Sequence, residues 1–230
     1  METGNPLGAR QPTPVRFRRR RAADAPVLRE VGLGGERVSL RPVRAADAET
    51  AFRILHQRDE ILRWLSVQGP ESLEEMANSY GRWAWRSARE TRYQLAICEA
   101  SSGGFAGWLG LVLASGKGSC ELGYWLEPRY WGRGFTSEAI ALACWLAFHH
   151  LRLDRVGAEV YVRNDASCRV LEKNGFVLMG LRALVPPRVP QAARLWRYEL
   201  SRRDHDGWVR DWTPRHERVE LAARVERRRS

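Results

Sequence analysis

Hydrophobic and polar residues follow two different periods along this chain. In the first part, apolar residues recur at helical spacing, which predicts three helices over 44–57, 59–66 and 70–90. Further on the period changes to two, which predicts three successive strands over 92–100, 104–114 and 119–127. Strands that follow one another so closely favour antiparallel pairing.

The pattern becomes mixed in the remaining part. It predicts, in order, a helix over 136–150, a strand over 155–162, a helix over 166–175 and strands over 176–185 and 192–201. One more alternating segment, 36–43, stands ahead of the first helix. The order is not a simple βαβ repeat, so the pattern predicts a mixed α/β domain over about 35–201.

The two ends of the chain lack this regularity. Residues 1–34 are rich in Pro, Gly, Ala and Arg, and are expected to form a disordered or loosely attached basic extension. Residues 202–230 are expected to form a second basic extension that is partly helical. Within it, 215–230 would place Val219, Ala222 and Val225 on one helical face. Residues 1–34 and the stretch after about Trp212 are expected to dock to an acidic partner, and neither is expected to be needed for cofactor binding.

Composition adds the net charge, the cysteine pattern and the length of the apolar runs to this picture. The net charge is +11 and the isoelectric point is about 10.3, which favours an acidic partner such as nucleic acid, an acidic protein surface or a phosphorylated small molecule. The four cysteines form no C-x-x-C pair, so no metal site is predicted and buried free thiols are expected. No apolar run reaches the length of a membrane span, and a cytoplasmic protein with no membrane partner is expected.

The segment RYWGRGFTSEA, residues 129–139, carries the clearest chemistry. Gly132 and Gly134 stand just before a predicted helix, whose first backbone N–H groups can bind an anion. The glycines leave room for that anion, and Arg129 and Arg133 add positive charge. The third glycine of a dinucleotide fingerprint is replaced by Ser137, and the G-K-[ST] of a Walker loop is absent. The segment therefore predicts a diphosphate site of another kind.

Three segments together resemble the GNAT superfamily of N-acetyltransferases. RYWGRG fits the [RQ]-x-x-G-x-[GA] loop that binds coenzyme A in that family, and GYWLEPRYWGRGFTSEA followed by NDASCRVLEKNGF resembles its RimJ/RimL-like branch. GERVSLRPV, at 35–43, is similar to the opening strand of that branch. The resemblance implies a mixed, mostly antiparallel sheet of six to seven strands flanked by helices, with a splayed strand pair that holds acetyl-CoA.

The same resemblance implies a set of cofactor contacts. Backbone groups of Trp125 and Leu126 would bind the pantetheine arm, and Asn164 would cap a helix, bind pantetheine, or do both. Lys173 would contact the adenosine 3′-phosphate or remain a solvated helix charge. The diphosphate would be held by the glycine loop, through backbone N–H groups of Gly132, Arg133, Gly134, Phe135 and Thr136, with Arg129 nearby.

Acetyl transfer to an amine by direct attack on the thioester needs a base and an acid. Many family members protonate the departing thiolate with a tyrosine, but Leu171 stands at that position here. The resemblance implies that Ser167 is the acid, unless its hydroxyl only bonds backbone. Glu121, on the same strand face as Gly123 and Trp125, is the candidate base. It could instead pair with an arginine, with water relaying the proton to solvent.

The acceptor is not contained in these motifs. The first expectation for the acceptor is a protein N-terminal α-amine, of a ribosomal or another protein. The alternative acceptor is a small-molecule amine such as an antibiotic or metabolite. Trp64, Trp83 and Trp85 would wall an acceptor pocket or pack in the core. An alternative function of a different class is that the protein is catalytically inactive and either binds nucleic acid through its basic tails or serves as a scaffold. The protein is expected to be a monomer or a homodimer.

Overall fold

The computed structural model describes residues 27–56, 58–65, 69–86, 92–114, 118–184, 193–208 and 212–222. Its strands are β1 (Val27–Gly34), β2 (Val38–Pro42), β3 (Arg92–Glu99), β4 (Phe105–Leu113), β5 (Ser119–Leu126), β6 (Arg155–Tyr161), β7 (Val177–Leu184), β8 (Ala193–Ser201) and β9 (His216–Ala222). Its helices are α1 (Asp47–Leu55), α2 (Asp59–Leu62), α3 (Leu73–Arg86), α4 (Phe135–Trp145), α5 (Asp165–Lys173) and α6 (Arg202–Trp208). A 3₁₀ turn, η2 (Pro128–Tyr130), precedes α4, and a π-helical turn, η3 (Leu146–His150), continues it.

All described strands join one sheet in the order β7-β8-β6-β5-β4-β3-β2-β1-β9. Every neighbouring pair is antiparallel except β5 and β6. The expected mixed, mostly antiparallel α/β fold is therefore confirmed. The expected count of six to seven strands is wrong, because β1 and β9 extend the sheet to nine.

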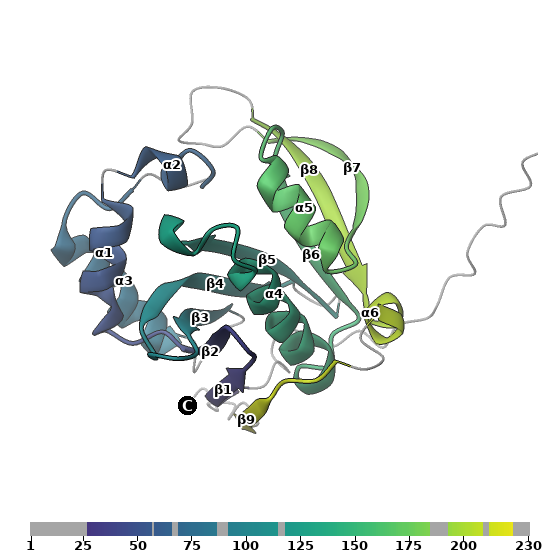
Figure 1. The fold of residues 1–230 in the computed structure, drawn as a ribbon, viewed down its shortest axis with the longest axis horizontal. Coiled ribbons are helices and arrows are strands. Elements are labelled where there is room, and N and C mark those ends of the chain that lie inside the picture. Colours follow the sequence, from purple (N-terminus) through teal and green to yellow (C-terminus); the bar gives the residue numbers. More distant parts are fainter. Residues whose placement is uncertain are drawn as a thin grey trace, which may run out of the picture.

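Helices cover both faces of the sheet, and the alternation of side chains along the strands explains why (Figure 1). On β3, Leu95 and Ile97 enter the larger core beneath α4, whereas Ala96 and Cys98 enter the smaller core with α1 and α3. Because successive strand residues point to opposite faces, a strand covered on both sides must be apolar at nearly every position. β3 meets that requirement, since six of its eight residues are buried.

The expectation of a loose extension over 1–34 is wrong for its last part. Residues 27–34 form β1, which pairs with β2 on one side and β9 on the other. Val31 and Leu33 are buried in the larger core. The arginine-rich composition of the preceding residues conceals this short alternation when the segment is read as a whole.

The helix expected over 215–230 is also wrong where the structure describes it. Residues 216–222 form β9, and Val219 lies opposite Val31 of β1. The segment HERVELA fits either period, and an unpaired strand edge on β1 decides in favour of a strand because it supplies hydrogen-bond partners. The expectation of partial helix in this extension holds at α6, directly after β8.

Other expectations from the pattern hold. Cys98, Cys120 and Cys144 are buried free thiols, and Cys168 is half-buried and free. Within the described ranges, no helix combines the length and the apolar character required to cross a bilayer.

Candidate active site

The parallel strands β5 and β6 separate partway along their length. They pair from Ser119 with Arg155 to Leu122 with Ala158, where the ladder ends. β5 nevertheless continues to Leu126 and β6 to Tyr161. The predicted splayed pair is therefore present, and unpaired backbone groups face one another across the opening.

The register of β5 decides which backbone groups face that opening. Hydrogen-bonded pairs alternate along an antiparallel ladder, and the N–H of Glu127 donates to Ala106 O while the N–H of Ala114 donates to Ser119 O. The alternation puts the backbone groups of Trp125 toward Trp108 on β4. The expectation that Trp125 binds pantetheine through its backbone is therefore wrong, because those groups are already used within the sheet.

The backbone groups of Tyr124 and Leu126 point to the β6 side instead. The carbonyl of Leu126 accepts a hydrogen bond of 2.8 Å from the indole Nε1 of Trp131. The groups left to bind a ligand in the opening are therefore the N–H of Leu126 and both backbone groups of Tyr124. Sequence reasoning placed the contact one residue away from Tyr124 because it could not fix the ladder's phase.

The loop before α4 has the backbone conformation that its glycines suggest. Gly132 has φ 71° and Gly134 has φ 80°, both in the left-handed region that other residues avoid. Gly134 is the N-cap of α4 and provides no side chain to cap it. The first N–H groups of α4, which include those of Phe135 and Thr136, thus remain for an anion, and the helix dipole favours negative charge there.

A cavity of about 380 Å³ opens at this helix start. Three cationic side chains line it: Arg37 from the turn after β1, Arg133 from the glycine loop and Lys173 from the end of α5. Trp212, which follows α6, lines it as well. Positive charge, free helix N–H groups and an aromatic wall together suit a phosphate-bearing ligand with a flat ring.

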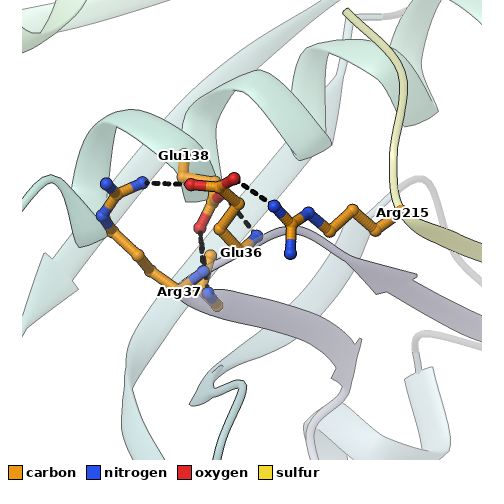
Figure 2. A network of polar contacts seen from close by, with 5 residues as sticks. Glu36, Arg37, Glu138 and Arg215 are labelled. Carbon is orange, nitrogen blue, oxygen red and sulfur yellow. Dashed lines mark hydrogen bonds and ion pairs between the residues drawn. The ribbon is translucent and has the colours of Figure 1, made fainter.

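Glu138 also lines the cavity, but its carboxylate is already engaged (Figure 2). It accepts hydrogen bonds from the backbone N–H groups of Glu36, Arg37 and Val38, at 2.7, 2.7 and 2.9 Å. The carboxylate of Glu36 in turn pairs with Arg37 and with Arg215. This network ties the start of α4 to the turn between β1 and β2 and to the C-terminal segment, so the anion site is held from three parts of the chain.

Arg129 lies apart from the cavity. Its side chain is 62% exposed, forms a 2.9 Å ion pair with Glu127 and stacks on the ring of Tyr130. A direct contact of Arg129 with the diphosphate therefore stays a prediction, whereas Arg133 and Lys173 lie where the prediction needs them.

A pair of hydroxyl groups spans the opening from β5 to α5. The hydroxyls of Tyr124 and Ser167 are 2.6 Å apart. Asn164 caps α5, with its Oδ1 accepting from the N–H of Ser167 at 3.2 Å, as the N-cap interpretation requires. Burial raises the pKa of Tyr124 to about 12, with a smaller opposing effect of the bond to Ser167. The phenol therefore keeps its proton at neutral pH.

Glu121 lies on the face of β5 opposite to Tyr124, and its carboxylate is paired but partly exposed. Its carboxylate accepts a hydrogen bond from Arg197 of β8. Arg197 can reach Glu121 because residue 157 of β6 is a glycine: a Cβ there would collide with the guanidinium of Arg197. Glu121 shares its face with Gly123 and Trp125, as the period of two predicts, and the exposed part of its side chain leaves it open to an incoming group.

Aromatic residues cover the neighbouring part of that face. The indole of Trp108 lies over Gly123, donates to Gln94 at 2.8 Å, and has its ring 5.8 Å from that of Trp83. The room for this indole comes from Gly110, which lies opposite Gly123 in a regular ladder, because a Cβ at Gly110 would lie 2.5 Å from the indole, whereas a Cβ at Gly123 would make only ordinary contact with it. Trp83 belongs to the rim of the smaller core, Trp64 is half-buried, and the side chain of Trp85 lies outside the described residues.

Sequence reasoning missed four residues that the fold brings to this region. Tyr124 carried a signal, since it stands within the GYW segment and alternates with Gly123 and Trp125. The other three come from distant parts of the chain, and no local pattern marks them: Arg37, Arg197 and Trp212.

Solved structures that share this fold include two acetyltransferases with bound cofactor. RimJ of Mycobacterium smegmatis, in complex with CoA-disulfide, matches with a TM-score of 0.66 and 22% identity over 77% of this chain and 90% of its own. Spermidine N-acetyltransferase from Vibrio cholerae, in complex with CoA and spermine, matches with a TM-score of 0.65 and 19% identity over 74% of this chain and 99% of its own. These two proteins share the fold of this chain, and RimJ is among its structural neighbours, as the resemblance predicts.

Sequence similarity identifies the family directly. The chain belongs to the GNAT acetyltransferase family, whose domain matches residues 37–177. A relative in Bacillus subtilis (strain 168), named "uncharacterized N-acetyltransferase YoaA", is 31% identical over 147 residues, which cover 64% of this chain and 82% of the relative. The predicted N-acetyltransferase class is confirmed.

Proposed function

We propose that the protein transfers the acetyl group of acetyl-CoA to the α-amine of a protein N-terminus. One observation supports acetyl-CoA as the cofactor. β5 and β6 separate next to the start of α4, whose first N–H groups have no side-chain cap and which Gly132 and Gly134 precede. The pantetheine arm would enter between the strands along Tyr124 and Leu126. The phosphates would lie in the cavity against Arg133 and Lys173.

Trp212 extends this cofactor site beyond the matched domain. Its ring lines the same cavity as Arg37 and lies edge-on to Trp145 of α4, with ring centroids 6.2 Å apart. An aromatic wall beside cations offers an adenine ring a stacking surface next to its phosphates. We therefore assign part of the adenosine site to the C-terminal extension.

The reaction requires stabilisation of a tetrahedral oxyanion and protonation of a thiolate. The N–H of Leu126 points into the opening and is the donor we assign to the oxyanion. Ser167 is the proton donor to the sulfur. Tyr124 would then return a proton to Ser167, since its phenol can donate to Ser167 Oγ while the Ser167 hydroxyl turns toward the sulfur, and the phenol would regain its proton from solvent. The chain then needs no tyrosine at position 171, where Leu171 is buried.

On the other face of the sheet, the amine would approach Glu121. The attacking amine must be neutral, so its ammonium form has to lose one proton before or during attack. Glu121 would accept that proton directly or through a water molecule, while Arg197 holds the carboxylate in position. The proton taken up there would pass to solvent through the exposed side of Glu121.

The charge of the acceptor face favours an α-amine over a polyamine. Around Glu121 the acidic side chains are matched by arginines: Arg197 pairs with Glu121 and lies 3.9 Å from Glu159, Arg182 pairs with Glu159, and Arg155 lies 3.7 Å from Glu199. A polyamine carries several positive charges and requires surplus carboxylates. A peptide N-terminus brings one charge and needs only one carboxylate.

A competition experiment tests the acceptor. The enzyme receives acetyl-CoA with equal concentrations of a peptide with a free α-amine, the same peptide with a blocked N-terminus and an internal lysine, and spermidine. Mass spectrometry then locates the acetyl group. We expect acetylation mainly at the free α-amine. Preferential acetylation of spermidine or of the lysine would overturn the acceptor assignment but leave the transferase assignment intact.

A further inference from the structure

A second polar cluster lies at the opposite end of α4, away from the anion cavity. The π-helical turn η3 presents His149, and α6 presents His205 and Asp206. One ligand-type atom from each of these three side chains lies within 4.8 Å of the other two. The cluster joins the end of the α4 region to the first element of the C-terminal extension.

The two imidazoles in this cluster have buried nitrogens without hydrogen bonds to described residues. His205 is 1% exposed, and neither Nδ1 nor Nε2 has a partner; His149 Nε2 is buried and unpartnered as well. The nearest carboxylate oxygen, on Asp206, is 3.6 Å from His205 Nδ1, beyond normal hydrogen-bond length. Buried polar atoms are nearly always satisfied, so these nitrogens call for a ligand that the described residues do not provide.

We propose that His149, His205 and Asp206 bind one divalent transition-metal ion of the Zn²⁺ type. Two imidazoles and a carboxylate form a ligand set suited to Zn²⁺, Co²⁺ or Ni²⁺, not to Ca²⁺ or Mg²⁺, which prefer oxygen ligands. Two ligands of one Zn²⁺ can be at most about 4.2 Å apart, because each bond is about 2.1 Å long. The cluster must therefore close slightly, and Asp206, whose side chain is 53% exposed, can rotate to do so.

The surroundings hold the ligands in place. The ring of His149 stacks on Trp145 with centroids 3.9 Å apart. Arg202 brings positive charge to the start of α6, but its guanidinium donates to the carbonyls of Phe148 and Leu153 and fixes α6 against η3. A bound ion would add a further crosslink between these two segments. It would stabilise the folded chain, since the unfolded chain does not hold the three ligands together.

The test uses the full-length protein without a histidine tag. Co²⁺ is added and its visible d–d absorption is titrated, and Zn²⁺ is then used to displace it. We expect one ion per chain and a rise in melting temperature. His149→Gln and Asp206→Asn, which replace the half-buried and the exposed ligand, should each weaken binding by roughly tenfold or more. His56→Gln, an exposed histidine elsewhere, is the matched control and should bind as the wild type does.

Two results would overturn the metal site. One is a folded wild-type protein that binds neither ion at micromolar concentration. The other is binding that both ligand variants retain at wild-type strength, since the ion would then lie elsewhere. Circular dichroism of each variant shows whether it is folded, and the readout does not depend on acetyl transfer.

Discussion

Tyr124 and Ser167 illustrate how two ordinary hydroxyls acquire a role from position. The 2.6 Å contact joins β5 to α5 across the splayed strands. Because burial raises the pKa of Tyr124 to about 12, the phenol remains a donor throughout the neutral range. Through this contact Tyr124 can return a proton to Ser167 after each transfer, and solvent then replaces the proton that the pair has lost.

We expect Ser167→Ala to lower kcat by roughly 10²–10⁴-fold, the usual range for loss of a general acid. Tyr124→Phe should lower kcat by less, because the Ser167 hydroxyl survives. The double variant should be no slower than Ser167→Ala, since both residues act in one relay. Steady-state kinetics with saturating acetyl-CoA measures this, and additive effects of the two substitutions would contradict the relay.

The glycine loop yields a second prediction at this scale. Gly134→Ala should weaken acetyl-CoA binding, because φ of 80° strains alanine and its Cβ lies beside the phosphate approach. Gly103→Ala is the matched control: φ is 69°, a Cβ would touch nothing within 4 Å, and the turn joins β3 to β4. Both variants should lose about 1 kcal/mol of stability. Calorimetry should show weaker binding for Gly134→Ala alone; equal affinities would remove the loop from the cofactor site.

What the sequence could reveal at this scale depended on distance along the chain. The role of Gly132 and Gly134 follows from their neighbours, since a helix start and its loop are local. The partner of Glu121 does not, because Arg197 is two strands away in the sheet and 76 residues away in the sequence. Which backbone groups of a strand face which neighbour also depends on residues far away in the sequence. The sequence therefore predicts a contact at Trp125, whereas Tyr124, together with the predicted Leu126, faces the opening.

Among the elements, the start of α4 is tied to the turn between β1 and β2 by a single side chain, Glu138. Glu138 accepts three backbone N–H groups from the turn between β1 and β2 (Figure 2). Such bonds to a charged acceptor contribute about 1.5–3 kcal/mol each when buried and less when exposed. This one carboxylate therefore sets where the helix start lies relative to Arg37.

We expect Glu138→Ala to destabilise the fold by roughly 2–4 kcal/mol, because three N–H groups lose a charged acceptor. It should also weaken acetyl-CoA binding, since the helix start and Arg37 would no longer be held together. Glu74→Ala, an exposed acid in the first turn of α3, is the control and should change little. Urea unfolding and calorimetry measure the two effects. A fully stable Glu138→Ala protein would show that other contacts position α4.

The elements themselves were predictable where their periodicity was clear. The three successive strands β3, β4 and β5 and the helices α4 and α5 lie where the pattern predicts them. β1 and β9 were missed because they come from opposite ends of the chain and pair with each other. Two segments at opposite ends of a chain that complete each other's ladder leave no local signal of their pairing.

At the scale of the whole molecule, the C-terminal extension is part of the domain. It includes α6, Trp212, which lines the cavity, and β9, which lies beside β1 (Figure 1). It thereby connects the cofactor site, the proposed metal site and the strand that covers β1. Trp212 itself lines the cavity, and the expectation that the stretch after it is dispensable for cofactor binding stays a prediction.

Truncations should separate its parts. Removal of 209–230 should lower the melting temperature, since β1 loses its partner, and should weaken acetyl-CoA binding. Removal of 223–230 alone should change neither, because β9 and Trp212 remain. Trp212→Ala in the full chain should weaken binding about twofold to tenfold, the effect of losing one aromatic contact of about 0.5–1.5 kcal/mol. Unchanged affinity in Trp212→Ala would exclude the ring from the adenosine site.

The most direct test of the central claim is the release of CoA thiol from acetyl-CoA by the wild-type protein, followed with and without a peptide that has a free α-amine. The account predicts rapid release that needs the peptide, is lost when its N-terminus is blocked, and falls sharply in Ser167→Ala. A protein that binds acetyl-CoA but releases no thiol with any amine would contradict it and leave only a binding fold.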